Sequence, residues 1–167
     1  MNEHLTKQEI IEVVDDNRDL LQEAADEIIS RGCYSVYVST AEKGELLDHP
    51  EIEGLYSIIS KDRDDDRVYE SIDDDVFDRV LGIHGIEFIS FDPDFKEFGC
   101  GGSGFGPGTH YYGFYYAEDD VPAGIWGEDF DLTESGDGWI WEEGGSGDNR
   151  YYTEKILDNW YYYEMHF

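Results

Sequence analysis

Residues 99–116, GCGGSGFGPGTHYYGFYY, are the first stretch whose residue types and spacing could do chemistry. They contain the pattern G-x-G-x-x-G, at Gly99, Gly101 and Gly104. This pattern binds a pyrophosphate when it leaves a strand and opens a helix. Here it runs through Pro107 into aromatic residues, and no lysine or arginine lies between Lys96 and Arg150. We therefore expect a structural loop that turns one strand into the next, with a loop that orders on a partner as the alternative.

Cys100 and His110 raise the question of a thiol nucleophile with its base. A reactive thiolate needs positive surroundings, whereas the sequence around Cys100 is acidic, which raises the pKa of a thiol. We interpret Cys100 as a buried or unreactive thiol. With Cys33 as the second of two cysteines, the chain has too few for a disulfide framework.

A second pattern resembles the loop of an EF-hand. Its oxygen-bearing residues stand at positions 1, 3, 5 and 12 of such a loop, namely Asp131, Thr133, Ser135 and Glu142. An EF-hand needs a helix on each side, but GWIW at 138–141 has the composition of a strand. Another D-x-D-x-D, at 62–66, lacks the glycine that should follow it. We expect no dedicated metal or cofactor, although an acidic surface can hold Ca²⁺ or Mg²⁺ adventitiously.

Carboxylates and tryptophans together could also form a carbohydrate site. Two carboxyl groups can act as acid and base in glycoside hydrolysis, and indole rings stack on sugars. The rings to consider are Trp139, Trp141 and Trp160. Aromatic residues at strand spacing are more often part of a core than a platform. An enzyme or carbohydrate-binding domain with its site among these C-terminal aromatics and acids is therefore our alternative function.

Net charge is the outstanding property of the composition. The 167 residues include 41 acidic and 11 basic ones, giving −30 at pH 7, and the acids are spread along the whole chain. Such a surface repels nucleic acid and anionic lipid, and it attracts and steers basic proteins. Imitation of nucleic acid is possible if the charges gather on one face. Solubility or adaptation to high salt is the plain alternative.

The chain offers no sign of export or membrane insertion. Its start, MNEHLTKQEI, has no apolar run of a secretory signal, and no apolar stretch is long enough to span a bilayer. We expect a cytoplasmic, microbial protein that does not associate with membranes.

The elements that must position these residues begin with a long helix predicted over residues 7–31. Thr6 and Glu9 form a capping box, and apolar residues then recur at helical spacing until Gly32. Strands are predicted at 33–39, 54–60 and 86–91. Between them we expect a charged loop at 61–67 and a second helix that Ser71 caps.

The rest of the chain is rich in aromatics and predicts strands at 111–116, 138–141, 150–157 and 160–167. Asp158-Asn159 predicts a two-residue hairpin turn that pairs Ile156 with Tyr161. Together these elements predict one α+β domain, 1–167, with a helix-containing half at 1–98 and a glycine- and aromatic-rich β half at 99–167. Its sheet is expected to be mainly antiparallel, with about five to seven strands, packed by the two helices.

These observations lead to a non-enzymatic binding or inhibitor protein as the expected function. In composition the chain is similar to bacterial immunity proteins, which neutralise a basic partner. An acidic surface would speed association, and exposed aromatics would make the contact. The residues expected to bind such a partner are Asp64, Asp65, Asp66, Asp73, Asp74, Asp75, Phe105, His110 and Trp126.

Overall fold

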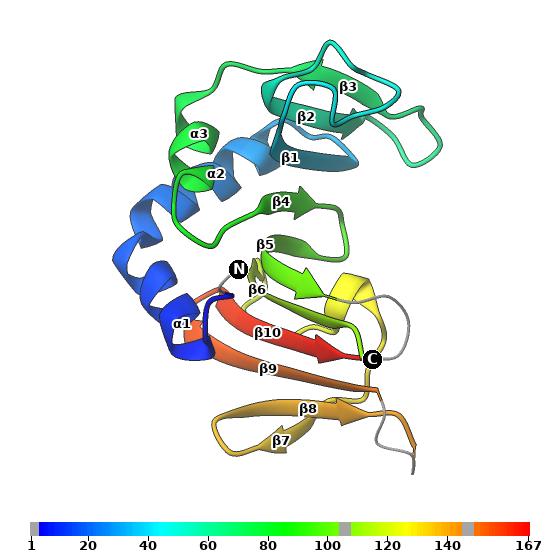
Figure 1. Ribbon diagram of the computed structural model, residues 1–167. Helices are drawn as coiled ribbons and strands as arrows, with labels where there is room; N and C mark the ends of the chain where they lie inside the picture. The colour runs from blue at the N-terminus through cyan, green and yellow to red at the C-terminus, as the bar shows by residue number, and fades with distance from the viewer. Residues whose placement is uncertain (1–3, 104–107, 145–148) are drawn as a thin grey trace.

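In the computed structural model, which describes residues 4–103, 108–144 and 149–167, ten strands form one antiparallel sheet with three α-helices against one face (Figure 1). The helices are α1 (Lys7–Asp16), α2 (Arg18–Ser30) and α3 (Asp75–Leu81). The strands are β1 (Ser35–Ala41), β2 (Gly54–Ser60), β3 (Val68–Ser71), β4 (Phe88–Phe91), β5 (Lys96–Ser103), β6 (His110–Tyr116), β7 (Thr133–Ser135), β8 (Gly138–Glu142), β9 (Arg150–Leu157) and β10 (Trp160–His166). A short 3-10 turn, η1 (Ile125–Gly127), follows β6.

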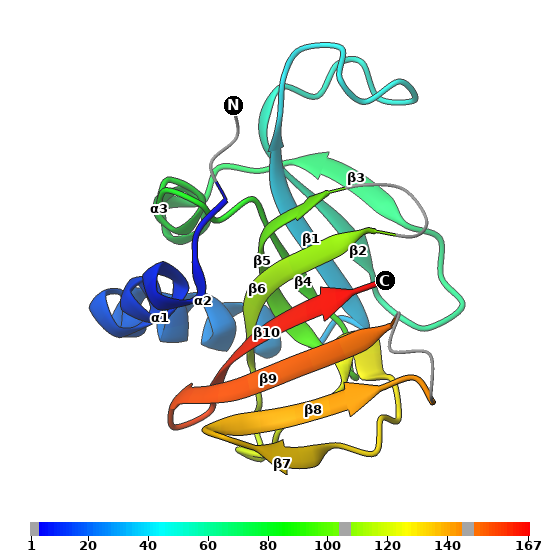
Figure 2. The same cartoon turned by 60° about the horizontal axis from the view of Figure 1, so that its bottom comes forward.

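The order of the strands across the sheet is β3-β2-β1-β4-β5-β6-β10-β9-β8-β7. The sheet twists strongly, so that β1 and β8 run in clearly different directions (Figure 2). The α+β class and the antiparallel sheet are confirmed, but the expected five to seven strands are too few. None of the described helices has both the length and the apolar composition needed to cross a bilayer.

The predicted N-terminal helix is two helices. Its start is confirmed, because the Glu9 amide donates to Thr6 Oγ1 at 3.2 Å and the Thr6 amide donates to Glu9 Oε2 at 2.7 Å. At Asn17 the backbone leaves helical geometry (φ −119°, ψ 17°), and the side-chain amide donates to the carbonyl of Val13 at 2.8 Å. Asparagine competes in this way with helical backbone bonds. The second helix ends as expected before Gly32, whose φ is +64°.

Three strands were not predicted, β3, β5 and β7. β3 lies between clusters of aspartates that favour a loop, and β7 has three residues only. The helix after β3 is capped by Asp74, which accepts from the Phe77 amide at 3.1 Å, and not by Ser71, which belongs to β3. The charged and turn-forming residues around β3 and β7 predict loops, but pairing with neighbouring strands stabilises both segments as strands.

β5 occupies the beginning of the glycine-rich stretch, so the expectation of a loop is wrong for this part. The Phe88 ring covers Gly99, where a Cβ atom would approach a ring carbon to 2.2 Å. At Gly101 (φ +149°) the pairing with β6 shifts by one residue in a β-bulge. Glycine is needed here for close packing and for the bulge. Residues 104–107 lie outside the described part of the chain.

Two large apolar cores lie on opposite faces of the sheet, and a third, smaller one holds Ala41, Ile52 and Tyr56. The first is packed between the helices and the sheet, and its buried members include Ile10, Leu21, Val38, Phe77, Ile89, Phe98, Phe114 and Trp160. The second lies beneath the segment 117–132, on the reverse face of β6, β10 and β9, and includes Phe95, Tyr115, Ile125, Tyr151, Tyr161 and Tyr163. β10 therefore buries aromatics on both faces, which confirms that it is an inner strand covered by helices on one side.

The β9–β10 hairpin has the predicted two-residue turn but a different register. Leu157 pairs with Trp160, and a bulge then opposes Lys155, instead of Ile156, to Tyr161. Lys155 consequently pairs with Asp120 at 2.6 Å. The extra residue in β9 could not be read from turn composition, because a bulge depends on the neighbouring strands.

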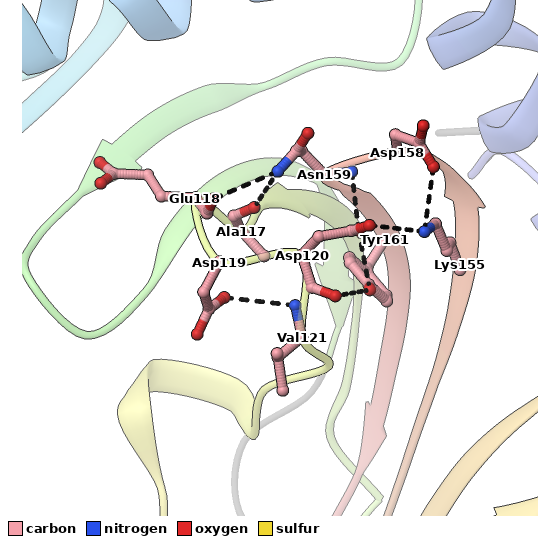
Figure 3. A network of polar contacts seen from close by, with 9 residues as sticks. All are labelled: Ala117, Glu118, Asp119, Asp120, Val121, Lys155, Asp158, Asn159 and Tyr161. Atoms are coloured by element: carbon pink, nitrogen blue, oxygen red, sulfur yellow. Dashed lines mark hydrogen bonds and ion pairs between the residues drawn. The ribbon is translucent and has the colours of Figure 1, made fainter.

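Asp120 joins this turn to the segment that follows β6 (Figure 3). Its carboxylate accepts from the Asn159 amide at 2.8 Å and from the Lys155 ammonium at 2.6 Å. The Tyr161 hydroxyl donates to the Asp120 carbonyl at 2.8 Å. Asp120 and Asn159 both have positive φ (54° and 71°), a conformation that Asp and Asn tolerate best among residues other than glycine. This network fixes one end of the cover over the second core.

We expect Asp120→Ala to lower the urea midpoint of unfolding much more than Asp120→Asn. Alanine removes every side-chain acceptor and keeps a strained positive φ, whereas asparagine retains an acceptor oxygen for the Asn159 amide and tolerates that backbone. Equal midpoints for the two variants, measured by circular dichroism in urea, would contradict the role given to this network.

Candidate functional site

The six predicted aspartates lie at the two ends of β3. Residues 64–66 are exposed in the connection from β2, and Asp73 and Asp75 are exposed before and at the start of α3. Asp74 has a structural role as the helix cap and lies 3.6 Å from Arg31. The structure thus brings the two clusters to one margin of the sheet, where only part of their charge is neutralised.

A further acidic surface lies on the helices and was not predicted as a site. It consists of the exposed acids of α1 and α2, namely Glu9, Glu12, Asp15, Asp16, Asp19, Glu23 and Asp26, and is called here the acidic helical surface. None of these seven takes part in an ion pair within the described residues. The sequence showed these acids opposite the apolar stripe, a pattern that any solvated helix has. Their lack of ion pairs emerges only from the fold.

Trp126 is the exposed aromatic of the predicted set. Its side chain is 47% exposed, and its φ of 56° is unusual for a bulky residue. Its ring makes an edge contact with Tyr111 at 5.3 Å and stacks on Phe167 at 6.3 Å. Phe105, predicted beside it, lies outside the described residues.

His110 lies on the other face of the sheet from Trp126. It pairs in register with His166, and the Nδ1 atoms of the two rings are in contact. Burial lowers the pKa of His166, although the Glu164 carboxylate, 3.8 Å from Nε2, acts in the opposite direction. Both histidines are partly buried. Trp126 contacts Tyr111, which alternates with His110 along β6, so the side chains of His110 and Trp126 point to opposite faces of the sheet.

Beneath Trp126 lies Glu97, a buried carboxyl that sequence reasoning missed. The Tyr163 hydroxyl donates to its Oε2 at 2.6 Å. Burial raises the pKa of Glu97 to about 7, although hydrogen bonds from Tyr163 and Trp126 act in the opposite direction. Its position on β5, within a glycine-rich stretch, gave no signal of burial.

The proposed metal ligands do not converge. Asp131 precedes β7, Thr133 and Ser135 lie in β7, and Glu142 ends β8 opposite Arg150. The β7–β8 hairpin directs Glu142 away from its turn, at a distance of about 13 Å along the strand from Gly138. No group of three or more histidine, cysteine, aspartate or glutamate side chains in the described residues is placed to hold a metal ion.

The features that could support catalysis are also separated. Cys100 is fully buried, which raises its pKa, and it belongs to the first core. Trp160 is 1% exposed, so its ring is no sugar platform, and the partly buried Trp141 stacks one face of its ring on Phe130 at 4.0 Å. Trp139 is partly buried against the second core.

Two hollows of the surface flank the β4–β5 turn. One, of about 330 Å³, is lined by Phe95, Lys96, Tyr115, Tyr116, Glu118 and Val121 among others. A second, of about 280 Å³, is lined by Ser35, Val36, Tyr37, Ile58, Arg67, Ser90 and Asp92. The carboxylates at the first hollow, Asp94, Glu118 and Asp119, are exposed. It therefore lacks the buried acid that glycoside hydrolysis requires.

Glu97 should make the stability of the fold depend on pH. Because its pKa is raised from 4.5 to about 7 in the folded chain, its contribution is fully present below pH 4.5 and is lost as the pH rises to about 7. The loss amounts to about 3 kcal/mol at 1.4 kcal/mol per pKa unit. Glu97→Gln should remove this part of the pH slope in urea unfolding from pH 4.5 to 8. Glu87→Gln, at an exposed position, should keep it, and an unchanged slope in Glu97→Gln would refute the assignment.

Comparison with known proteins adds no function to this geometry. No family model matches the chain, and no curated protein or solved structure is similar enough to count as a relative. The acidic helical surface, the β3 margin and the Trp126–Glu97 pair must therefore be interpreted from their own chemistry.

Proposed function

We propose that the chain is a non-enzymatic binding protein that takes a basic protein partner on its acidic helical surface. One observation carries this proposal: Glu12, Asp16 and Glu23 each repel a carboxylate four residues away, and Asp15 and Asp16 lie at the negative end of the α1 dipole. Glu9 and Asp19, in the first turns of α1 and α2, are placed favourably with respect to the dipole. An acidic residue that only confers solubility could stand anywhere on the surface, including places where it stabilises a helix.

The spacing of the acids is unfavourable along each helix. Carboxylates four residues apart repel each other, at Glu12–Asp16, Asp19–Glu23 and Glu23–Glu27. Each such pair destabilises a helix by about 0.2–0.5 kcal/mol at low salt. Only Glu27 has a cation beside it among the described residues, with Arg31 at 3.0 Å.

The helix dipoles add to this cost. Asp15 and Asp16 lie in the last turn of α1, where the partial charge is negative and a cation would be stabilising. Arg18, in contrast, is the first residue of α2, where a cation is unfavourable. Neither helix has a basic residue in its last turn.

A basic surface docked on the helices would replace these repulsions by attractions. The same charges would steer the partner before contact, an effect that falls as salt shortens the screening length from about 10 Å at 0.1 M to about 3 Å at 1 M. Ile29, 39% exposed near the end of α2, supplies apolar area beside the acids. A basic toxin or nuclease, which such a binding protein would inhibit, has the required positive charge.

A pair of variants with equal net charge tests the binding surface. The first carries Glu12→Gln, Asp16→Asn, Asp19→Asn and Glu23→Gln. The control carries Glu128→Gln, Asp129→Asn, Asp131→Asn and Asp137→Asn, around β7. Immobilised wild type and control should retain a specific basic protein from host extract at about 50 mM salt, whereas the helical variant should retain at least about tenfold less, and about 500 mM salt should weaken the complex.

Lysozyme and cytochrome c, as general basic proteins, set the background in this experiment. The retained protein is then purified, and its affinity for all three chains is measured by titration calorimetry. Equal affinity for the two variants, or binding that is insensitive to salt, would overturn the proposal.

Binding of a basic partner and stability of the free chain make opposite demands on the charge of this surface. Asp16→Lys removes a repulsion with Glu12 and places a cation in the last turn of α1, so the free energy of unfolding should rise by about 0.5–1 kcal/mol at low salt. The gain should fade at high salt. Asp137→Lys, in the β7–β8 turn, serves as the control in urea unfolding. A loss of stability in Asp16→Lys at low salt would contradict the charge argument.

A further inference from the structure

The β3 edge, Val68–Ser71, has backbone groups that no described strand pairs. β3 is the first strand of the sheet order and has β2 as its only neighbour (Figure 1). The Ile72 amide donates to the Leu55 carbonyl at 3.0 Å, so Ile72 faces β2. In an antiparallel ladder alternate residues face the same neighbour. The N–H and C=O groups of Tyr69 and Ser71 therefore point away from the sheet.

This edge also presents apolar area. Val68 is 57% exposed, and it is the one large apolar side chain in a described strand that is classed as exposed. Leu47, in the connection between β1 and β2, is 90% exposed. Tyr69 is partly buried and stacks on His49 at 4.3 Å, which holds the strand in an extended conformation.

The charges around the β3 edge select what can pair with it. Glu70 is exposed within the strand, and exposed aspartates stand at both ends, at 64–66 and at Asp73 and Asp75. These acids outnumber the exposed cations beside the strand, which are Lys61, Arg63 and Arg67. A second copy of this chain would bring two edges of net negative charge together, with Glu70 near its own copy, which disfavours pairing. A strand rich in lysine or arginine would instead meet opposite charges. The other margin strand, β7, has three residues and no large exposed apolar side chain.

We propose that an extended, lysine- or arginine-rich segment of the partner pairs with the β3 edge as an added strand. Backbone hydrogen bonds to Tyr69 and Ser71 would supply affinity, and the flanking aspartates would supply selectivity for cationic side chains. This inference rests on the proposed function, because it specifies how part of a basic partner binds.

A synthetic nine-residue peptide of alternating lysine and threonine is the probe. Its control has the same sequence and charge, with N-methyl groups on alternate residues that remove the backbone donors of one edge. The wild-type chain should bind the unmodified peptide about tenfold or more tightly than the control. Amide hydrogen exchange at Tyr69 and Ser71 should slow when the peptide is bound, while exchange at Glu134 in β7 should not change.

Ser71→Pro supplies a test on the chain itself. Proline removes an outward N–H that β2 does not use, so the strand tolerates it, and Ser71→Thr is the matched control. Weaker binding of the unmodified peptide to Ser71→Pro than to Ser71→Thr supports the pairing, as does protection of the two amides in wild type.

Equal binding of the two peptides, without protection at Tyr69 and Ser71, would overturn pairing at β3. If that binding still depends on salt and on the acids of α1 and α2, the proposed function stands alone. If neither peptide binds and the helical variant retains the same proteins as wild type, both proposals fail.

Discussion

Burial of aromatic side chains on both faces of β10 is the constraint on which the rest of the fold depends. Trp160 and Tyr162 face the helices, whereas Tyr161 and Tyr163 face the second core, and all four are nearly inaccessible to solvent. Each face therefore needs its own cover. The helices supply one, and the irregular segment 117–132 must supply the other. This requirement explains why the two larger cores lie on opposite faces of the sheet.

Tyrosine serves the second core better than phenylalanine because an irregular cover leaves backbone groups that need partners. The Tyr151 hydroxyl donates to the Ala123 carbonyl at 2.8 Å, and the Ala123 amide donates to the Tyr115 hydroxyl at 2.9 Å. The hydroxyl of Tyr161 does the same for Asp120. The tyrosines thus bury their rings and hold the cover through their hydroxyls. The abundance of tyrosine in this half of the sequence follows from that double role.

The sequence predicted those features that depend on neighbours along the chain. The Thr6–Glu9 capping box and the stop at Gly32 are local, and so is the turn at 158–159. Features that depend on distant partners were missed. β5 pairs with β4 because Gly99 leaves room for the Phe88 ring, and the strand propensities of single residues do not reveal such a contact. For the same reason Glu97 could not be recognised as buried, since its cover comes from a different segment.

The same division between local and distant neighbours applies to the candidate sites. Trp126 was singled out by residue type and is exposed, but the sequence could not show that His110 lies on the opposite face. The acids of α1 and α2 were visible as a polar stripe. The fold adds that none of the seven acids of the acidic helical surface forms an ion pair within the described residues. Chemistry can be proposed from residue types, but the absence of a compensating charge is a property of the folded surface.

The same negative charge disfavours pairing of β3 with a second copy of the chain and favours pairing with a cationic strand. An open strand with an exposed valine is ordinarily a hazard, because a second copy of the chain can pair with it. Here every copy carries −30, and the acids around β3 outnumber the cations there, so self-pairing is repulsive. A cationic strand meets no such barrier. Charge therefore allows this chain to keep the β3 edge open, where a neutral protein would have to shorten, cover or twist it away.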